Sequence, residues 1–167
     1  MTSAPRRRNK PIPAVDIVIE SPLWARGRGI KTMLRRAVGE AACVTARGGE
    51  LAIVLIDDAA IRVLNRNWLR KDEPTNVLSF PTRQRFADGP DHLGDIVIAY
   101  QTSAREAKAE HKPFGHHLAH LAVHGFLHLV GYDHETDAQA ETMEDLEIAA
   151  LARIGVPNPY IARVRKG

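Results

Sequence analysis

The sequence has little of what stabilises secreted or membrane proteins. It has one cysteine, Cys43, so no internal disulfide can form, and we expect its thiol to be reduced on the buried face of a helix. No apolar run approaches the roughly 18 residues that a membrane-spanning helix requires. The basic cluster at 6–8 is not followed by a hydrophobic signal core. We therefore expect a cytoplasmic protein with no membrane insertion and no obvious export signal.

The excess of charge of one sign is also small. The 23 lysines and arginines and 20 aspartates and glutamates give a formal net charge of +3, which suits a polyanion partner without requiring one. Residues 1–13 are basic, rich in proline and free of acidic residues, so we predict a flexible arm. The arm could contact nucleic acid electrostatically, although a solvated tail is the simpler interpretation.

The apolar pattern predicts one α+β domain over residues 14–160, with a small mixed β-sheet packed around a central buried helix. Strands are expected at 14–20, 51–56, 77–80 and 96–100. Helices are expected at 24–42, from 57 or 58 through 68, at 102–110, at 114–130 and at 138–153. Residues 83–92 are expected to form a loop, and residues 161–167 a basic C-terminal tail. The helix at 114–130 is the central one, because it is apolar around most of its circumference.

Three histidines in and just beyond that central helix have the spacing of metal ligands. His124 and His128 are four residues apart, so they project from the same helix face. Gly131 is suited to end the helix in a left-handed conformation, which returns the chain and brings His134 towards that face. Three imidazoles with one open position form the arrangement of a catalytic zinc, so we predict one Zn²⁺ per chain. Nickel or another metal favoured by imidazole is also compatible.

The remaining five histidines are weaker candidates for the site. One of them, His120, shares a helix face with His124 and could support a ligand imidazole, but helix packing explains it equally well. The other four have simpler explanations as packing, surface or loop residues: His92, His111, His116 and His117.

The residue after the first ligand separates this pattern from the metzincin proteases. Those proteases share the histidine spacing and carry a glutamate general base at that place, whereas this chain has Gly125. Another group must therefore move the proton, and Asp133 is nearest in sequence. Asp133 could equally cap the turn or accept a hydrogen bond from a ligand imidazole.

Three ordered blocks of the sequence resemble the YbeY family of bacterial and organellar endoribonucleases. They are HGFLHLVGYDH at 124–134, KDEPTNVLSFP at 71–81 and LGDIVI at 93–98. The resemblance implies a zinc held by the three histidines and cleavage of single-stranded RNA. It also implies ribosomal RNA and the small ribosomal subunit as partners, through maturation of the 3′ end of small-subunit ribosomal RNA and ribosome quality control.

The sequence departs from the family pattern just before the second block. Where family members usually have an arginine thought to matter for RNA cleavage, this chain has Leu69, and Arg70 stands at the usual glycine. Arg70 or Arg66 could supply a bidentate phosphate contact from a shifted direction, because a guanidinium fork matches phosphate geometry. Four other polar residues could line the site or merely cap strands: Thr75, Asn76, Ser79 and Asp95.

Two other functions keep the metal. A hydrolase of peptide or small-molecule bonds is disfavoured by the missing protease glutamate. A ribosome-assembly factor with a structural zinc would bind RNA without cutting it, and the leucine at position 69 favours that interpretation. The spacing of the histidines does not distinguish these functions from an endoribonuclease.

Overall fold

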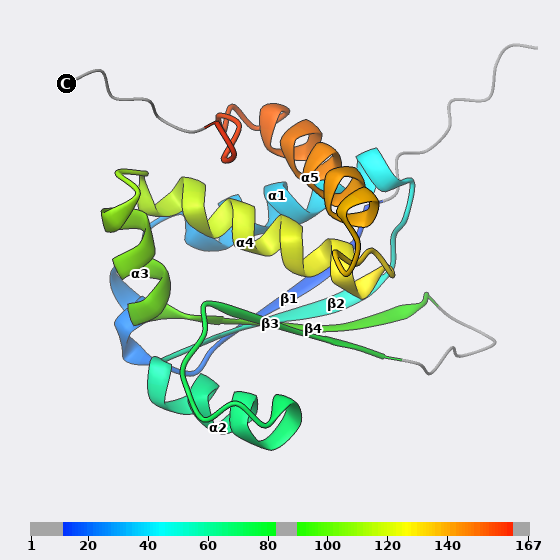
Figure 1. Ribbon diagram of the computed structural model, residues 1–167. Coiled ribbons are helices and arrows are strands. Elements are labelled where there is room, and N and C mark those ends of the chain that lie inside the picture. Colours follow the sequence, from blue (N-terminus) through cyan, green and yellow to red (C-terminus); the bar gives the residue numbers. More distant parts are fainter. Residues whose placement is uncertain (1–11, 83–89, 162–167) are drawn as a thin grey trace, which may run out of the picture.

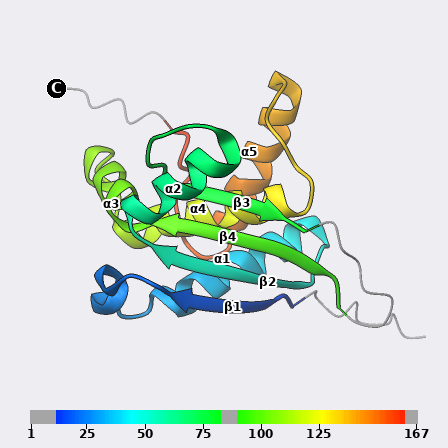
Figure 2. The same ribbon diagram turned by 90° about the horizontal axis from the view of Figure 1, so that it is seen from below.

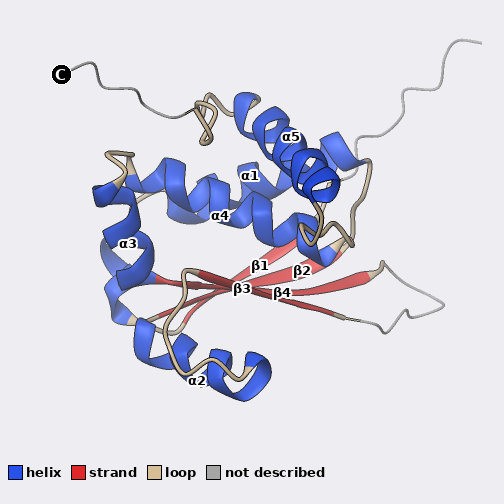
Figure 3. Cartoon of the chain, in the orientation of Figure 1, coloured by secondary structure: helices blue, strands red, loops and turns tan. Residues whose placement is uncertain are grey.

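The computed structural model describes residues 12–82 and 90–161, which form a four-stranded sheet covered by helices (Figures 1 and 3). Nearly all of the tail predicted at 161–167, nearly all of the arm predicted at 1–13 and most of the loop predicted at 83–92 lie outside the described residues. The strands occur in the spatial order β1 (Ala14–Ile19), β2 (Glu50–Ile56), β4 (His92–Ala99) and β3 (Val77–Pro81). The first three are parallel and β3 pairs antiparallel to β4, which confirms a small mixed sheet.

Helices lie on both faces of this sheet (Figures 1 and 2). One face is covered by α1 (Ile30–Thr45), α4 (Phe114–Leu129) and α5 (Asp137–Ala152), and the other by α2 (Asp58–Leu69). The short α3 (Tyr100–Ala109) links the end of β4 to the start of α4. In the described part of the chain, no helix is long and apolar enough to cross a membrane.

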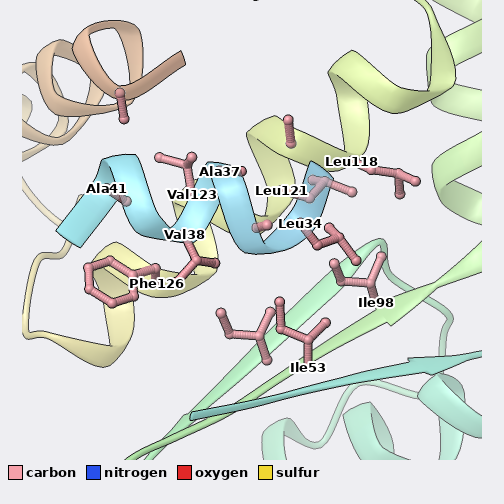
Figure 4. Packing of buried hydrophobic residues seen from close by; sticks show 14 of the residues in the cluster. Leu34, Ala37, Val38, Ala41, Ile53, Ile98, Leu118, Leu121, Val123 and Phe126 are labelled. Carbon is pink, nitrogen blue, oxygen red and sulfur yellow. The ribbon is translucent and has the colours of Figure 1, made fainter. Parts of the chain in front are cut away.

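The larger hydrophobic cluster fills the space between the sheet and the three-helix face (Figure 4). From α4, Leu118, Ala122 and Phe126 have no exposed surface, which confirms this helix as the central buried one. Successive residues of β4 face opposite sides of the sheet. Ile96 therefore joins the larger cluster and Val97 the smaller cluster under α2, so β4 is buried on both faces.

The prediction of a single helix at 24–42 is wrong. The structure has a 3₁₀ turn at Pro22–Arg26 and then α1, separated by glycines that include Gly29 at a φ of 77°. Trp24 explains the separation, because it is only 2% exposed and its indole N–H donates to the carbonyl of Ile56 at 2.9 Å. An anchored indole fixes this turn against the sheet, outside the register of the following helix.

Strand β4 begins four residues before the predicted start at Ile96, so His92 is a strand residue rather than a loop residue. The strand is extended because its first residues pair with both β2 and β3. Gly94 hides the earlier start of β4 from a sequence-based prediction, because glycine is unusual inside a strand. Glycine is nevertheless required there, because its φ is 128° and a Cβ would lie 2.1 Å from the Phe80 carbonyl oxygen. Cys43, predicted on the buried face of a helix, lies in α1 as a half-buried free cysteine.

Candidate metal centre

The C-terminal end of α4 and the turn after it form the site. Gly131 adopts a φ of 100°, the left-handed conformation predicted for it. Its N–H donates to the His128 carbonyl at 3.1 Å, and the next N–H, from Tyr132, donates to the Leu127 carbonyl at 2.9 Å. These bonds satisfy carbonyls that the helix end leaves open, and they reverse the chain. The reversal brings His134 back to the two helical histidines.

The three predicted ligands converge. The Nε2 atoms of His124 and His128 are 3.0 Å apart, and one ring nitrogen from each of the three histidines lies within 4.8 Å of the others. The His134 ring centroid is 5.5 Å from that of His124 and 5.0 Å from that of His128. The helical pair is half-buried and His134 is exposed, so the cluster opens to solvent on one side.

The hydrogen bonds of the helical pair decide which ring nitrogens face the cluster. The Nδ1–H of His128 donates to the Tyr132 carbonyl at 3.0 Å, and the Nδ1–H of His124 donates to Glu147 Oε1 at 3.1 Å. Both acceptors lack a proton, so each neutral ring carries its hydrogen on Nδ1 and directs the Nε2 lone pair into the cluster. A tetrahedral zinc holds nitrogens about 3.3 Å apart, given its ~2.0–2.1 Å bonds, so this donor set fits such an ion.

Glu147 of α5 is a site residue that the sequence analysis missed. Its side chain is 1% exposed and accepts hydrogen bonds from His124, from the Tyr160 hydroxyl at 2.7 Å and from Nε2 of His120. The predicted supporting role of His120 is therefore indirect, through this shared carboxylate. A buried carboxylate behind a ligand imidazole fixes the orientation of the ring and raises its basicity.

The surroundings shift two pKa values in the cluster. Burial raises the pKa of Glu147, but the hydrogen bonds from His120, His124 and Tyr160 outweigh burial and lower the pKa to about 2. The carboxylate is therefore charged at neutral pH. Burial, followed by the charge of His124, lowers the pKa of His128 below its ordinary value, which favours the neutral form that a metal requires.

A cavity of about 560 Å³ adjoins the cluster and is bounded by the edge strand β3 and the loop before it. Three of the four polar residues predicted near the site line it: Thr75, Asn76 and Ser79. Asn76 and Ser79 also have structural partners, since Asn76 donates to Glu106 Oε2 at 3.0 Å and Ser79 Oγ donates to the Gly125 carbonyl at 3.1 Å. Asn76 and Ser79 therefore line the cavity and also make hydrogen bonds that support the fold.

The structure distributes the predicted phosphate-binding residues unevenly. Among the described residues, those lining this cavity include Leu69 and Lys71 but not Arg66 or Arg70. Arg66 lies in the last turn of α2, and Arg70 caps that helix at a φ of 56°. Both arginines are exposed. The apolar side chain at 69 thus lines the same cavity as the metal ligands.

The two predicted aspartates lie in different places. Asp133 lines the cavity and accepts the backbone N–H of His134 at 2.8 Å, so it also holds the turn that carries this ligand. Asp95 pairs with Phe80 near the end of the β3–β4 ladder and is not among the described residues that line the cavity.

Close packing explains the glycine at position 125. A Cβ there would lie 2.8 Å from Ile96 Cγ2 and 3.2 Å from Ser79 Oγ. The helix therefore crosses the sheet too closely for any side chain, and a glutamate in the metzincin manner could not be accommodated without moving α4. The absence of the protease general base is thus a consequence of the packing.

Comparisons with known proteins cover the part of the chain that forms this site. A family model described as endoribonuclease YbeY matches residues 26–155, a span that includes all three histidines and Glu147. The chain belongs to the YbeY family. Relatives described as endoribonuclease YbeY include one from Rhodopseudomonas palustris (strain BisB18), 54% identical over 155 residues, which cover 89% of this chain and 92% of the relative. Another, from Nitrobacter hamburgensis, is 52% identical over 92% of this chain and 85% of the relative.

A solved structure supports the fold of this YbeY family member. The solution structure of a Thermotoga maritima protein superposes with a TM-score of 0.51 and 22% identity, covering 92% of this chain and 99% of that one. At this identity the likeness bears on the fold alone. Together the family model and the relatives confirm the resemblance recognised in the sequence.

Proposed function

We propose that this protein is a zinc-dependent endoribonuclease that cleaves single-stranded RNA in the maturation and quality control of ribosomal RNA at the small ribosomal subunit. The observation that carries the proposal is the convergence of the three histidines, with Nε2 of His124 and His128 directed at one point, beside an open cavity. Membership in an endoribonuclease family supplies the substrate class.

A zinc ion held by the three histidines would supply a Lewis acid that lowers the pKa of bound water to about 7 and offsets negative charge at a phosphoryl oxygen. The protein's own contribution is to present neutral, oriented imidazoles, with Glu147 behind His124 and the Tyr132 carbonyl behind His128. Asp133, at the cavity wall, is proposed to move the proton that the attacking oxygen loses.

We further propose that Arg70 or Arg66 binds a phosphate of the RNA. Both side chains are exposed at the C-terminal end of α2, next to the loop that bounds the cavity, so a bound strand that leaves the cavity along α2 comes within their reach. Lys71, which lines the cavity, is the competing candidate. Alanine variants of the three, compared for RNA affinity at several salt concentrations, identify the phosphate ligand as the one whose loss reduces the salt slope by about one.

The deciding experiment measures metal content and RNA cleavage on the same samples. Wild type is expected to hold about one zinc per chain and to cut single-stranded RNA that carries the 3′ end of the small-subunit ribosomal RNA precursor. The His128→Ala variant is expected to lose most of the metal, all measurable cleavage and some stability. His116→Ala is the matched control, because it removes a half-buried histidine of the same helix outside the metal cluster.

The outcomes separate the competing functions. Zinc binding and RNA binding without cleavage by wild type favour the assembly factor. Cleavage that persists in the metal-free His128→Ala variant contradicts the metal-dependent mechanism. A substrate with deoxyribose on the 5′ side of the cut distinguishes two routes, because it blocks attack by the neighbouring 2′-hydroxyl and leaves attack by water possible.

A further inference from the structure

A second cavity adjoins the metal cavity along α4. It has a volume of about 320 Å³ and shares three wall residues with the metal cavity, namely Asn76, Val77 and His124. Its remaining walls come from α3 and the turn after it, from the earlier turns of α4, and from the segment after α5, including Pro159 and Tyr160. A ligand that reaches the metal can therefore extend into this second cavity without leaving the protein surface.

The second cavity contains an unsatisfied buried side chain. His117 is 4% exposed, and neither of its ring nitrogens has a hydrogen-bond partner among residues 12–82 and 90–161. Its nearest charge is Glu106, whose Oε2 lies 3.4 Å from Nε2. Both nitrogens are enclosed by protein atoms, so the ring must turn towards the cavity before a ligand can bond to them. Because leaving buried polar groups without a partner is unfavourable, a ligand that supplies the missing bonds favours that turn.

The surroundings of His117 select the chemistry of that ligand. Burial lowers the pKa of His117 below its ordinary value, although Glu106 and Glu110 oppose the shift, so the ring offers one donor and one acceptor. The only lysine among the described wall residues, Lys112, is paired with Glu110 at 2.8 Å and donates to the Pro159 carbonyl at 3.2 Å. The nearby carboxylates disfavour binding of a phosphate, and the lysine is already paired with one of them.

The other walls favour a flat, uncharged ring. Leu121, Val77 and Pro159 offer apolar surface, and the rings of His120 and Tyr160 stand nearly perpendicular, with centroids 5.5 Å apart. A nucleobase combines an apolar, polarisable face with a hydrogen-bonding edge, and protein sites that read single-stranded RNA use aromatic rings and polar side chains in this way. The His120 ring is also only 6.5 Å from that of the metal ligand His124, measured between centroids.

We propose that this second cavity binds the base of the nucleotide next to the cleaved phosphodiester, with His117 bonding to the edge of the base. The inference rests on the proposed endoribonuclease function and deepens it. In this proposal the earlier turns of α4 select the nucleotide, and the last turn holds the metal. The enzyme then requires a base at one position beside the cut.

The test is a double-mutant cycle between protein and RNA. His117→Leu removes both ring nitrogens and keeps an apolar side chain, and the RNA is made with or without a base at each nucleotide flanking the cut. Wild type is expected to lose about 10-fold or more in kcat/KM when the base at one position is missing. His117→Leu is expected to show a similar loss on intact RNA and little further loss on that abasic RNA, because both changes remove one interaction.

Two further variants separate the proposed role from a structural one. His117→Gln keeps a donor and an acceptor and is expected to recover part of the base dependence. His116→Leu changes a histidine that does not line the second cavity and is expected to retain the wild-type response. Metal content and the free energy of unfolding are measured for every variant, and His117→Leu is expected to keep both, because it removes unsatisfied buried groups.

The results distinguish failure of this inference from failure of the proposed function. If wild type cuts intact and abasic RNA equally well at every flanking position, or if the losses from His117→Leu and from base removal multiply, the base cavity is refuted and cleavage stands. If wild type binds RNA but does not cut it, the same cycle is measured as Kd, and the base cavity is judged there. RNA that is neither cut nor bound contradicts both.

Discussion

Glu147 offers the sharpest test of how the metal site is organised. Its carboxylate is 1% exposed and accepts the Nδ1–H of His124, so it fixes the ring that carries a metal-binding nitrogen. Loss of such a supporting group typically reduces metal affinity by about 10- to 100-fold. Glu147→Gln keeps the shape and one acceptor oxygen but not the charge, so we expect about 10-fold weaker zinc binding. Glu147→Ala removes the acceptor altogether, and we expect it to weaken zinc binding by about 100-fold.

The assay is competition for zinc with a chelating indicator at neutral pH, and its matched control is Glu141→Gln on the exposed face of the same helix. The control is expected to bind zinc like wild type. Far-ultraviolet circular dichroism of the metal-free variants checks that α4 and α5 are intact. Wild-type affinity in a folded Glu147→Ala protein would falsify the supporting role of this carboxylate.

Glu147 is also expected to make the free energy of unfolding of the metal-free protein depend on pH in acid. The pKa of Glu147 is about 2 in the folded chain, against 4.5 as its ordinary value. A carboxylate with a lowered pKa stabilises the fold above its unfolded pKa and loses that contribution as pH falls through its folded pKa. We therefore expect the difference in unfolding free energy between wild type and Glu147→Gln to shrink, by up to about 3 kcal/mol, as pH falls from near 4.5 towards 2. A pH-independent difference contradicts this.

Three further perturbations test other parts of the site. Acid is expected to release the metal, because its ligand imidazoles must be neutral, and full retention of zinc at about pH 4.5 contradicts histidine ligation. Gly125→Ala is expected to lower the free energy of unfolding in urea by about 1–3 kcal/mol, because its Cβ would lie 2.8 Å from Ile96 Cγ2, and an unchanged midpoint contradicts that packing. Leu69→Arg is expected to tighten RNA binding and to steepen its dependence on log salt by about one, and an unchanged slope means that this side chain does not reach a phosphate.

The metal ligands could be predicted from the sequence because their relation is local. Helical periodicity alone places His124 and His128 on one face. A glycine just past the helix is a sufficient signal for the reversal that returns His134, and Gly131 has the expected left-handed φ. The small sheet and the buried central helix also followed from apolar patterning, since short apolar runs marked the strands and an apolar circumference marked the helix.

The supporting shell of the metal site could not be predicted in the same way. Glu147 lies 23 residues after His124, and its contact with that ring depends on how α5 packs on α4. One signal was nevertheless present. Glu147 follows Met143 by four residues and precedes Leu151 by four, so it lies on the buried face of an amphipathic helix. A charged residue in the middle of such a face is costly unless it has partners, and this cost marks it as a candidate for function.

The position of Trp24 illustrates a different limit. The predicted helix began at Trp24, although the regular spacing of apolar residues starts only at Ile30. The indole packs instead edge-on against Tyr100 at 5.1 Å and stacks with Phe114 at 6.0 Å between ring centroids. Both partners lie more than 70 residues further along the chain. A single buried aromatic with distant partners outweighs local helix preference, which is a weak determinant of structure.

The same long-range packing gives α4 its two proposed functions. Its contact with β4 requires Gly125, which removes the protease-type base, while an adjacent face of the helix carries the histidines at 117, 120, 124 and 128. Those four recur at three or four residues, so they form one continuous polar stripe beside two adjoining cavities. In the proposed functions, the RNA lies along this stripe. The last turn of α4 holds the metal at the cleaved bond, and the earlier turns hold the neighbouring base. The direction of the RNA is then set by the axis of α4, and the phosphate contacts are left to α2 across the cavity.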